Sequence, residues 1–132
     1  MKGQFLKLYV HKELQNLPPL RSAMFPLGLP NLSDYHRAQV DNANILYKLA
    51  IDIILFYKLG QIIVGVENPA NSWLWAALVK LSLEHSTAAA EAYNALEKVI
   101  FHRCCHGSTR RKATGWLGTA GVYTDLEATC PK

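Results

Sequence analysis

The feature that most limits how this chain can fold is the apolar stretch 45–66, which carries charged residues inside it. Its length would suit a membrane helix, since a bilayer is spanned by about 20 apolar residues. Lys48, Asp52 and Lys58 argue against that reading, because each charge at bilayer depth costs roughly 3 kcal/mol. Gly60 also falls where a soluble helix would end. We therefore expect this stretch to form a helix followed by a strand, and we expect no membrane partner. A small membrane protein that spans the bilayer through this stretch is the alternative.

The helix is predicted to begin at Ser33, whose hydroxyl can cap the first turn, with Asp34 favourably placed near the positive end of the helix. Apolar residues then recur at the spacing of one helix face as far as Tyr57. Residues 61–66 are mostly β-branched and are bounded by Gly60 and a polar turn, which is typical of a buried strand in a parallel sheet. A helix followed by such a strand favours an α/β fold.

Further elements are expected on both sides of this unit. Prolines and Gly28 make residues 1–32 an irregular lead-in to a domain over residues 33–132. A second helix is predicted from Asn71 or Ser72 through Leu81, and an Ala-rich third helix from about Thr87 to Lys98. The later segments are predicted to form a strand at 99–101, a hairpin around the basic residues of 103–118, and a short helix within 122–130.

Charge and cysteine content indicate which partners and which cellular compartment suit the chain. The net charge is +4 and the pI is near 9.0, which makes a polyanionic partner such as DNA plausible. The three cysteines are odd in number and two are adjacent, unlike the disulfide framework of a small secreted protein. The basic N-terminus lacks an unbroken apolar run, so we predict no signal peptide. An intracellular location is expected, and the nucleus is compatible with it.

One carboxylate stands out by its position. Glu67 heads the segment Glu67-Asn68-Pro69, directly after the predicted buried strand. Open α/β sheets build ligand sites at the carboxyl ends of their strands, so a functional role for this carboxylate is a reasonable hypothesis. The alternative is structural, with Glu67 capping the next turn or pairing with a nearby basic residue.

Several segments occur in an order that resembles a divergent family of methyltransferase-like proteins related to the DNA cytosine-5 methyltransferases. The resemblance spans roughly residues 18–130 and is most specific at Glu-Asn-Pro with its downstream Ser-x-x-Trp and at the basic hairpin. It implies the C-terminal part of a Rossmann-like, S-adenosylmethionine-dependent methyltransferase-type three-layer fold, with its N-terminal strands missing. The matching segments are Pro19-Leu20-Arg21-Ser22, Gly28-Leu29-Pro30, the helix from Val40 to Tyr47, Val66 to Trp75, Cys105-His106-Gly107 and Arg110 to Thr114.

The resemblance also implies roles for individual residues. Glu67 matches the catalytic glutamate that holds a flipped cytosine, although Pro69 stands where those enzymes have valine. Asn68 is expected to contact the substrate beside it. Arg110 and Lys112 are the nearest counterparts of a basic motif that places the nucleophile loop and DNA. Together with Arg111, they are expected to lie near the DNA phosphates.

Two parts of such an enzyme are missing from the sequence. The nucleophilic cysteine should precede Glu67, yet residues 1–66 contain no cysteine. No Gly-rich cofactor turn occurs before Glu67 either, so S-adenosylmethionine is the family's cofactor but is not expected to bind this chain alone. We expect a truncated, relic or split protein that is inactive alone, and whose missing half or another chain completes the sheet. Whether it acts as an enzyme is left open.

The alternative from a different class is a non-catalytic module that binds nucleic acid or a protein partner. It would keep the basic hairpin and lack the chemistry. His102, Cys104, Cys105 and His106 suggest zinc, but adjacent cysteines do not easily serve one tetrahedral ion and no second ligand pair has the usual spacing. We therefore predict no metal site from the sequence.

Overall fold

The computed structural model describes residues 19–60 and 62–130, which form an α/β arrangement of helices and a three-stranded sheet. All strand pairs in this sheet are antiparallel, and the strand order is β1-β3-β2. The elements in chain order are α1 (Asp34–Lys58), β1 (Gly65–Pro69), α2 (Leu74–His85), α3 (Thr87–Asn94), β2 (Leu96–His102), the short 3₁₀ helix η1 (Arg103–His106), β3 (Ala113–Thr119) and η2 (Thr124–Leu126).

The long first helix agrees closely with its prediction. Ser33 caps α1, because its hydroxyl accepts a hydrogen bond from the backbone N–H of His36 at 3.3 Å. The helix ends at Lys58, and Gly60 follows in the left-handed conformation with φ of 72°. Neither α1 nor any other helix within residues 19–60 and 62–130 combines the length and apolar character needed to cross a membrane.

The predicted parallel strand is wrong in direction and displaced along the chain. β1 covers residues 65–69 instead of 61–66, and it pairs antiparallel with β3. Gln61, the first residue of the predicted strand, lies outside the described residues. The antiparallel hairpin of β2 and β3 is confirmed. The structure thus confirms the α/β class, while the strand direction in the prediction is corrected.

Two boundaries also differ from the sequence-based expectation. The third helix stops at Asn94, because β2 begins at Leu96 and takes over residues that were predicted to be helical. The alternation that buries Val99 and Phe101 starts there, so strand pairing overrides the helix propensity of Lys98. In the predicted C-terminal helix, only the short η2 turn is helical.

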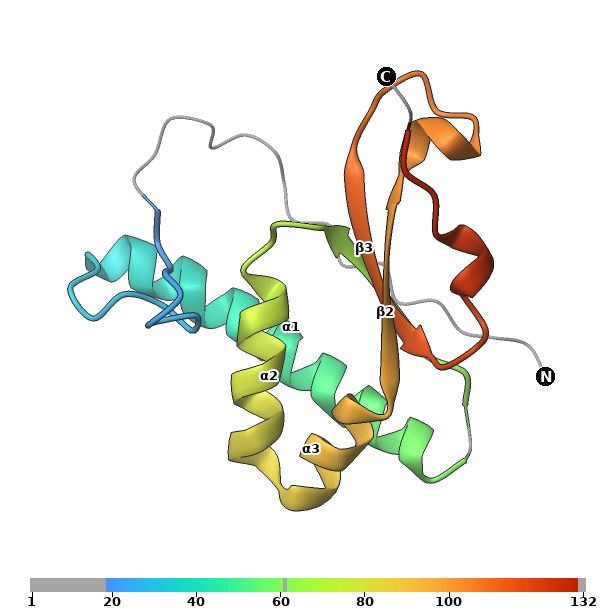
Figure 1. The fold of residues 1–132 in the computed structure, drawn as a ribbon. Coiled ribbons are helices and arrows are strands. Elements are labelled where there is room, and N and C mark those ends of the chain that lie inside the picture. The colour runs from blue at the N-terminus through green and yellow to red at the C-terminus, as the bar shows by residue number, and fades with distance from the viewer. Residues whose placement is uncertain (1–18, 61, 131–132) are drawn as a thin grey trace.

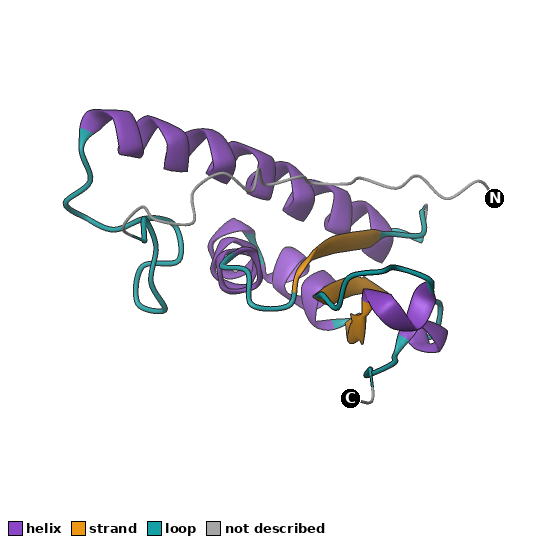
Figure 2. Ribbon diagram, turned by 90° about the horizontal axis from the view of Figure 1, so that it is seen from above, coloured by secondary structure: helices purple, strands orange, loops and turns teal. Residues whose placement is uncertain are grey.

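The main core lies between the helices and one face of the sheet. Figure 1 shows the three helices gathered on one side of the strands, and Figure 2 shows α1 running along the top of this layer. Val66 and Leu117 contribute the sheet side of the core. The helices contribute buried residues that include Tyr47, Ile51, Ile54, Leu74, Ala77, Leu78, Ala89 and Ala92.

The opposite face of the sheet is covered by the chain that follows β3, residues 120–130, which we call the C-terminal segment (Figure 1). Trp116 packs against Tyr123 with ring centroids 5.1 Å apart. The backbone N–H of His102 donates to the carbonyl of Ala128 at 2.8 Å, which ties this segment to the end of β2. Val99 and Phe101 are buried beneath it, with 3% and 8% of their surface exposed.

The lead-in is fixed to α1 by one arginine. The guanidinium of Arg21 donates to the carbonyl of Pro26 at 2.6 Å, to Oδ1 of Asn44 at 2.8 Å and to the carbonyl of Val40 at 3.3 Å. It also lies over the ring of Tyr47, 5.1 Å from its centroid. Residues 19–32 contain no helix or strand, as predicted, and the rest of the predicted lead-in, residues 1–18, lies outside the described residues.

Candidate nucleic-acid interface

The strand register brings three chain segments together at one end of the sheet. Pro69 at the end of β1 is aligned with Thr114, and His102 at the end of β2 is aligned with Ala113. The loop that joins β2 to β3 therefore lies at the end where β1 finishes. This places the Glu67 segment and the basic loop, defined as residues 103–112, at a common edge.

Glu67 faces away from the helical layer. Its aligned partner in β3 is Trp116, whereas the helix-facing core residues of these strands are Val66 and Leu117. Oε1 of Glu67 lies 3.8 Å from Nη2 of Arg103, the first residue of η1. The Glu67 side chain is 19% exposed and that of Arg103 is 41% exposed, so solvent reaches both partners. The sequence had left open a pairing with a basic residue, and the structure contains it.

Asn68 lies on the other face of β1, since neighbouring strand residues point to opposite sides. It is only 4% exposed, and its Nδ2 has no hydrogen-bond partner. Thr114, at 1% exposure, has an equally unsatisfied hydroxyl. An unsatisfied buried polar group costs stability. The two atoms lie on opposite faces of the sheet, because Asn68 is aligned with Gly115, the neighbour of Thr114. They therefore mark two separate positions where water or another segment could supply a partner. A substrate contact for Asn68 is a prediction that no contact in the structure tests.

The basic loop has a fixed backbone and exposed cations. The N–H of Arg103 donates to the carbonyl of Lys112 at 3.1 Å, and the N–H of Ser108 donates to the carbonyl of Arg103 at 3.1 Å. Gly107 allows this turn, because its φ of 86° is in the left-handed region. Arg110, Arg111 and Lys112 are all exposed. The fold thus presents these predicted binding residues beside the Glu67–Arg103 pair.

An open depression of about 420 Å³ lies within the same edge. It is lined by Phe101, Arg103, His106, Gly107 and Ser108. The rings of Phe101 and His106 meet edge to face with centroids 5.2 Å apart. Aromatic rings and a guanidinium are groups on which a nucleobase can stack. Sequence analysis missed this depression because its lining depends on how η1 folds back over β2.

The described residues do not fit S-adenosylmethionine as the resemblance would require. β1 is the first strand in residues 19–60 and 62–130, and the element before it is α1. Within the described residues, no strand followed by a Gly-rich turn therefore precedes Glu67 to bring backbone close to the cofactor. We derive no chemical step through this cofactor.

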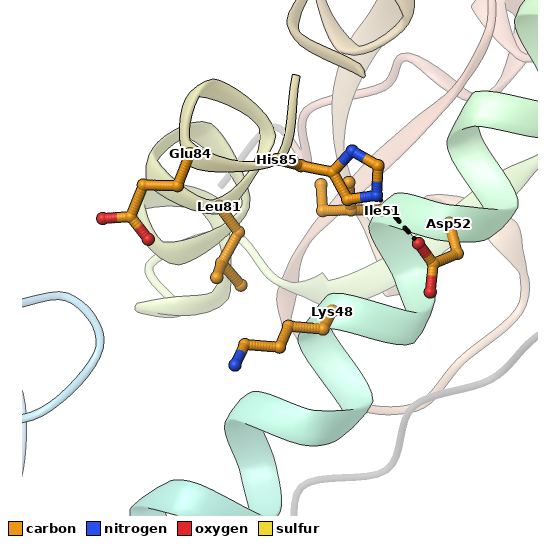
Figure 3. Close-up of a pocket in the computed structure, with 6 residues that line it drawn as sticks. All are labelled: Lys48, Ile51, Asp52, Leu81, Glu84 and His85. Atoms are coloured by element: carbon orange, nitrogen blue, oxygen red, sulfur yellow. Dashed lines mark hydrogen bonds and ion pairs between the residues drawn. The ribbon is translucent and has the colours of Figure 1, made fainter. Parts of the chain in front are cut away.

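A second depression lies between α1 and α2, away from the edge just described. Figure 3 shows Nε2 of His85 pointing to Oδ1 of Asp52, 3.1 Å away. Nδ1 of His85 lies 3.1 Å from the hydroxyl of Ser86, which gives an acid–histidine–serine series. Ser86, however, caps α3, and its oxygen accepts the N–H of Ala89 at 3.0 Å. We interpret the series as a structural contact between helices.

The three cysteines form a cluster that the sequence did not predict. Cys104 and Cys105 lie in η1, and the fold brings Cys130 to them from the C-terminal segment. No local spacing could have indicated this third member, because its approach depends on the path of the chain after β3. The expectation of no metal site was based on local spacing alone.

Comparisons with protein-family models, curated proteins and solved structures found no match to this chain.

Proposed function

We propose that this chain is the C-terminal part of a DNA cytosine methyltransferase-like domain, which binds DNA through its basic loop and is inactive alone. The observation that supports the proposal is the common edge of the sheet. There, Glu67 and Arg103 lie beside the exposed cations Arg110, Arg111 and Lys112. A carboxylate that is to hold a base needs neighbouring cations to hold the phosphates.

The basic loop would supply most of the affinity. Lysine and arginine side chains that neutralise phosphates release counterions, so the binding is expected to weaken steeply with salt. The loop backbone is fixed by the bonds of Arg103 to Lys112 and Ser108, which lowers the entropic cost of presenting these cations together.

Glu67 would supply a preference among bases. Its carboxylate is part-buried and is held near the depression by Arg103, which lines that depression. An unpaired cytosine entering the depression could stack on the exposed ring of His106 and the guanidinium of Arg103 while its ring edge approaches Glu67. Asn68 belongs to the same proposal as a second substrate contact, which requires its segment to rearrange because the side chain is buried on the other face.

A Rossmann-like parent fold is part of the proposal. Within the described residues, β1 is an edge strand that pairs only with β3. Antiparallel strands often lie at the edge of an otherwise parallel sheet, so the outer edge of β1 is where parallel strands of the missing half would add. An edge strand that pairs on only one side within the described residues can be completed by another segment or chain.

The test is the binding of the full chain to a fluorescent DNA duplex at several salt concentrations, measured by anisotropy. The double variant Arg110→Ala/Arg111→Ala removes two phosphate contacts. It should therefore reduce the steepness of the salt slope, the slope of the logarithm of the binding constant against the logarithm of the salt concentration, by about 2. The matched control Lys48→Ala/Lys80→Ala removes the same charge from α1 and α2. Equal effects of the two double variants would reject the basic loop as the interface.

Base recognition requires a second comparison. The wild-type chain should bind a duplex with one unpaired cytosine more tightly than the same duplex with an unpaired thymine. Glu67→Gln should remove this preference while leaving salt-dependent binding in place. If the preference is absent from the wild-type chain but binding still depends on Arg110 and Arg111, the chain is a nucleic-acid-binding module without base recognition.

A further inference from the structure

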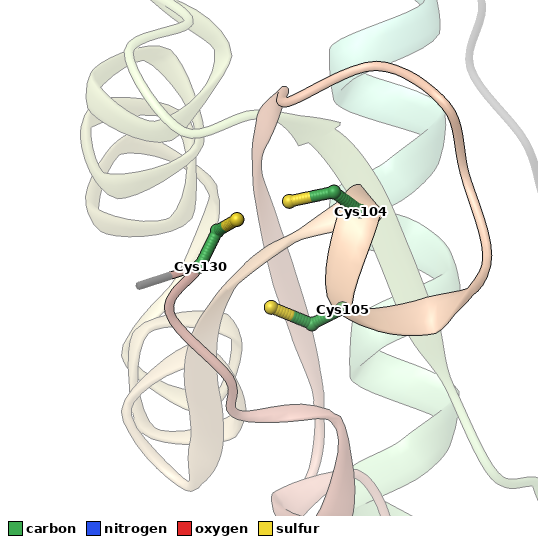
Figure 4. Close-up of side chains that lie close together, drawn as sticks. All are labelled: Cys104, Cys105 and Cys130. Atoms are coloured by element: carbon green, nitrogen blue, oxygen red, sulfur yellow. The ribbon is translucent and has the colours of Figure 1, made fainter. Parts of the chain in front are cut away.

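The three thiols of this chain converge on one point. Cys104, Cys105 and Cys130 are its only cysteines, and their Sγ atoms all lie within 4.8 Å of one another. Figure 4 shows two thiols projecting from η1 and the third facing them from the C-terminal segment. None of the three is in a disulfide.

Contacts that do not involve sulfur hold the segments in this arrangement. The carbonyl of Leu126 lies 2.8 Å from Nε2 of His106, and the N–H of Cys130 donates to Nδ1 of His102 at 2.9 Å. The N–H of His102 in turn donates to the carbonyl of Ala128. The C-terminal segment is therefore attached to both ends of η1, and the thiols are brought together by the fold.

The spacing suits a cation that prefers sulfur ligands. With metal–sulfur bonds of about 2.3 Å, thiolates around one zinc ion lie about 3.8–4.0 Å apart. Side chains within 4.8 Å need to move by less than about 1 Å to reach that spacing. A single disulfide would use only two of the three sulfurs, whereas one ion can take all of them.

We propose that Cys104, Cys105 and Cys130 form a three-thiolate site for a thiophilic divalent cation of the zinc type. The fourth coordination position is left to solvent or to an external ligand, the pattern of an open zinc site. The ion would link η1 to the C-terminal segment and so would fix the base of the basic loop. This site is independent of the proposed DNA-binding function.

The surroundings of the thiols act on thiolate formation in both directions. Partial desolvation and the neighbouring Cys104 raise the pKa of Cys105, and contacts with Cys104 raise the pKa of Cys130. Arg111 opposes both shifts, because its positive charge favours the thiolate. A thiol binds such a cation as the thiolate, so binding is accompanied by the release of protons.

The first experiment titrates the reduced full chain with Zn²⁺ against a chromogenic chelator and, separately, with Cd²⁺, which gives a sulfur-to-metal charge-transfer band. We expect one ion per chain and protection of all three thiols from alkylation in the loaded protein. Cys105→Ser and Cys130→Ser should each weaken binding at least about tenfold, the loss known even for residues that only orient metal ligands. His85→Ala, which removes an exposed imidazole outside the cluster, should bind Zn²⁺ as the wild-type chain does.

Folding is monitored separately by circular dichroism, so a variant that fails to fold is not counted. If the variants do not fold, protection of the wild-type thiols by Zn²⁺ from alkylation still tests whether they bind the ion. Absence of the charge-transfer band, or equal alkylation with and without Zn²⁺, would overturn the proposal. Recovery of a Cys130 disulfide from the reduced chain in air, with no ion bound at any Zn²⁺ concentration tested, would overturn it in favour of a redox pair.

Discussion

The carboxylate of Glu67 and the guanidinium of Arg103 lie 3.8 Å apart, although they come from the two outer strands of the sheet and its continuation into η1. The pair spans the central strand β3 and links the first strand, β1, to the basic loop. Because solvent reaches both groups, their attraction is worth about 0.2–1 kcal/mol. The pair is weak enough to open when a phosphate or a base competes for either partner.

This relationship predicts opposite effects for its two members on general DNA binding. Glu67→Gln removes a negative charge beside the loop, so affinity for a fully paired duplex should rise by up to about fivefold, the equivalent of a pair energy of about 1 kcal/mol. Arg103→Ala should lower the same affinity and reduce the salt slope by about 1. Anisotropy titrations at fixed salt measure both effects. Weaker duplex binding by Glu67→Gln would contradict the assignment of Glu67 to bases rather than phosphates.

Local patterns predicted the helices better than the strands. Ser33 and the apolar spacing after it define α1 within a few residues, because a capping hydroxyl and a helix face are local properties. The direction of β1 could not be read in the same way. An apolar β-branched run looks alike in parallel and in antiparallel sheets, and its partner β3 is far away in the sequence.

The candidate site was predictable to a similar extent. Glu67 and the basic loop stand out by residue type. The expected position of Glu67 directly after a strand was wrong, because the structure places it within β1. The Arg103 contact depends on the β1-β3-β2 order, which places the ends of both outer strands together. Cys130 joins the other thiols only because the chain after β3 turns back over the sheet. Both features are tertiary, so no spacing in the sequence encodes them.

Arg21 is predicted to be a structural residue of the lead-in. Arg21 is 9% exposed, and its guanidinium donates to two carbonyls and to the Asn44 side chain. Arg21→Ala should lower the free energy of unfolding by roughly 2–4 kcal/mol, because buried acceptors lose their donors. Arg21→Lys should recover only part of this lost stability, since an ammonium group cannot donate in the planar arrangement of a guanidinium. Urea unfolding measures both, and Arg110→Ala, on the exposed loop, should change stability by less than about 0.5 kcal/mol.

Gly115 is predicted to be required by the packing of Trp75. A Cβ at this position would lie 2.8 Å from Cζ2 of the indole, closer than carbon atoms can approach. The indole cannot easily move, because its Nε1 donates to the carbonyl of Pro69 at 2.9 Å. Gly115→Ala should therefore cost roughly 1–3 kcal/mol of stability. In a double-mutant cycle with Trp75→Phe, the cost should shrink, and strict additivity would show that the clash is absent.

Tyr93 is predicted to make the chain sensitive to alkaline pH. Burial raises the pKa of Tyr93 above its usual value, and this ring packs against the core. Between the unfolded pKa of about 10 and the higher folded pKa, the folded chain holds the proton that the unfolded chain has lost. The stabilisation is therefore complete below pH 10 and is lost as the pH rises further. Tyr93→Phe should lose less stability than the wild-type chain between pH 9 and pH 11. This range brackets the pKa of about 10 that a tyrosine has in the unfolded chain. The midpoints of urea unfolding at each pH measure the loss of stability. Tyr35→Phe is the control, because Tyr35 is 69% exposed. Parallel losses in the wild-type chain and both variants would show that other groups control the alkaline transition.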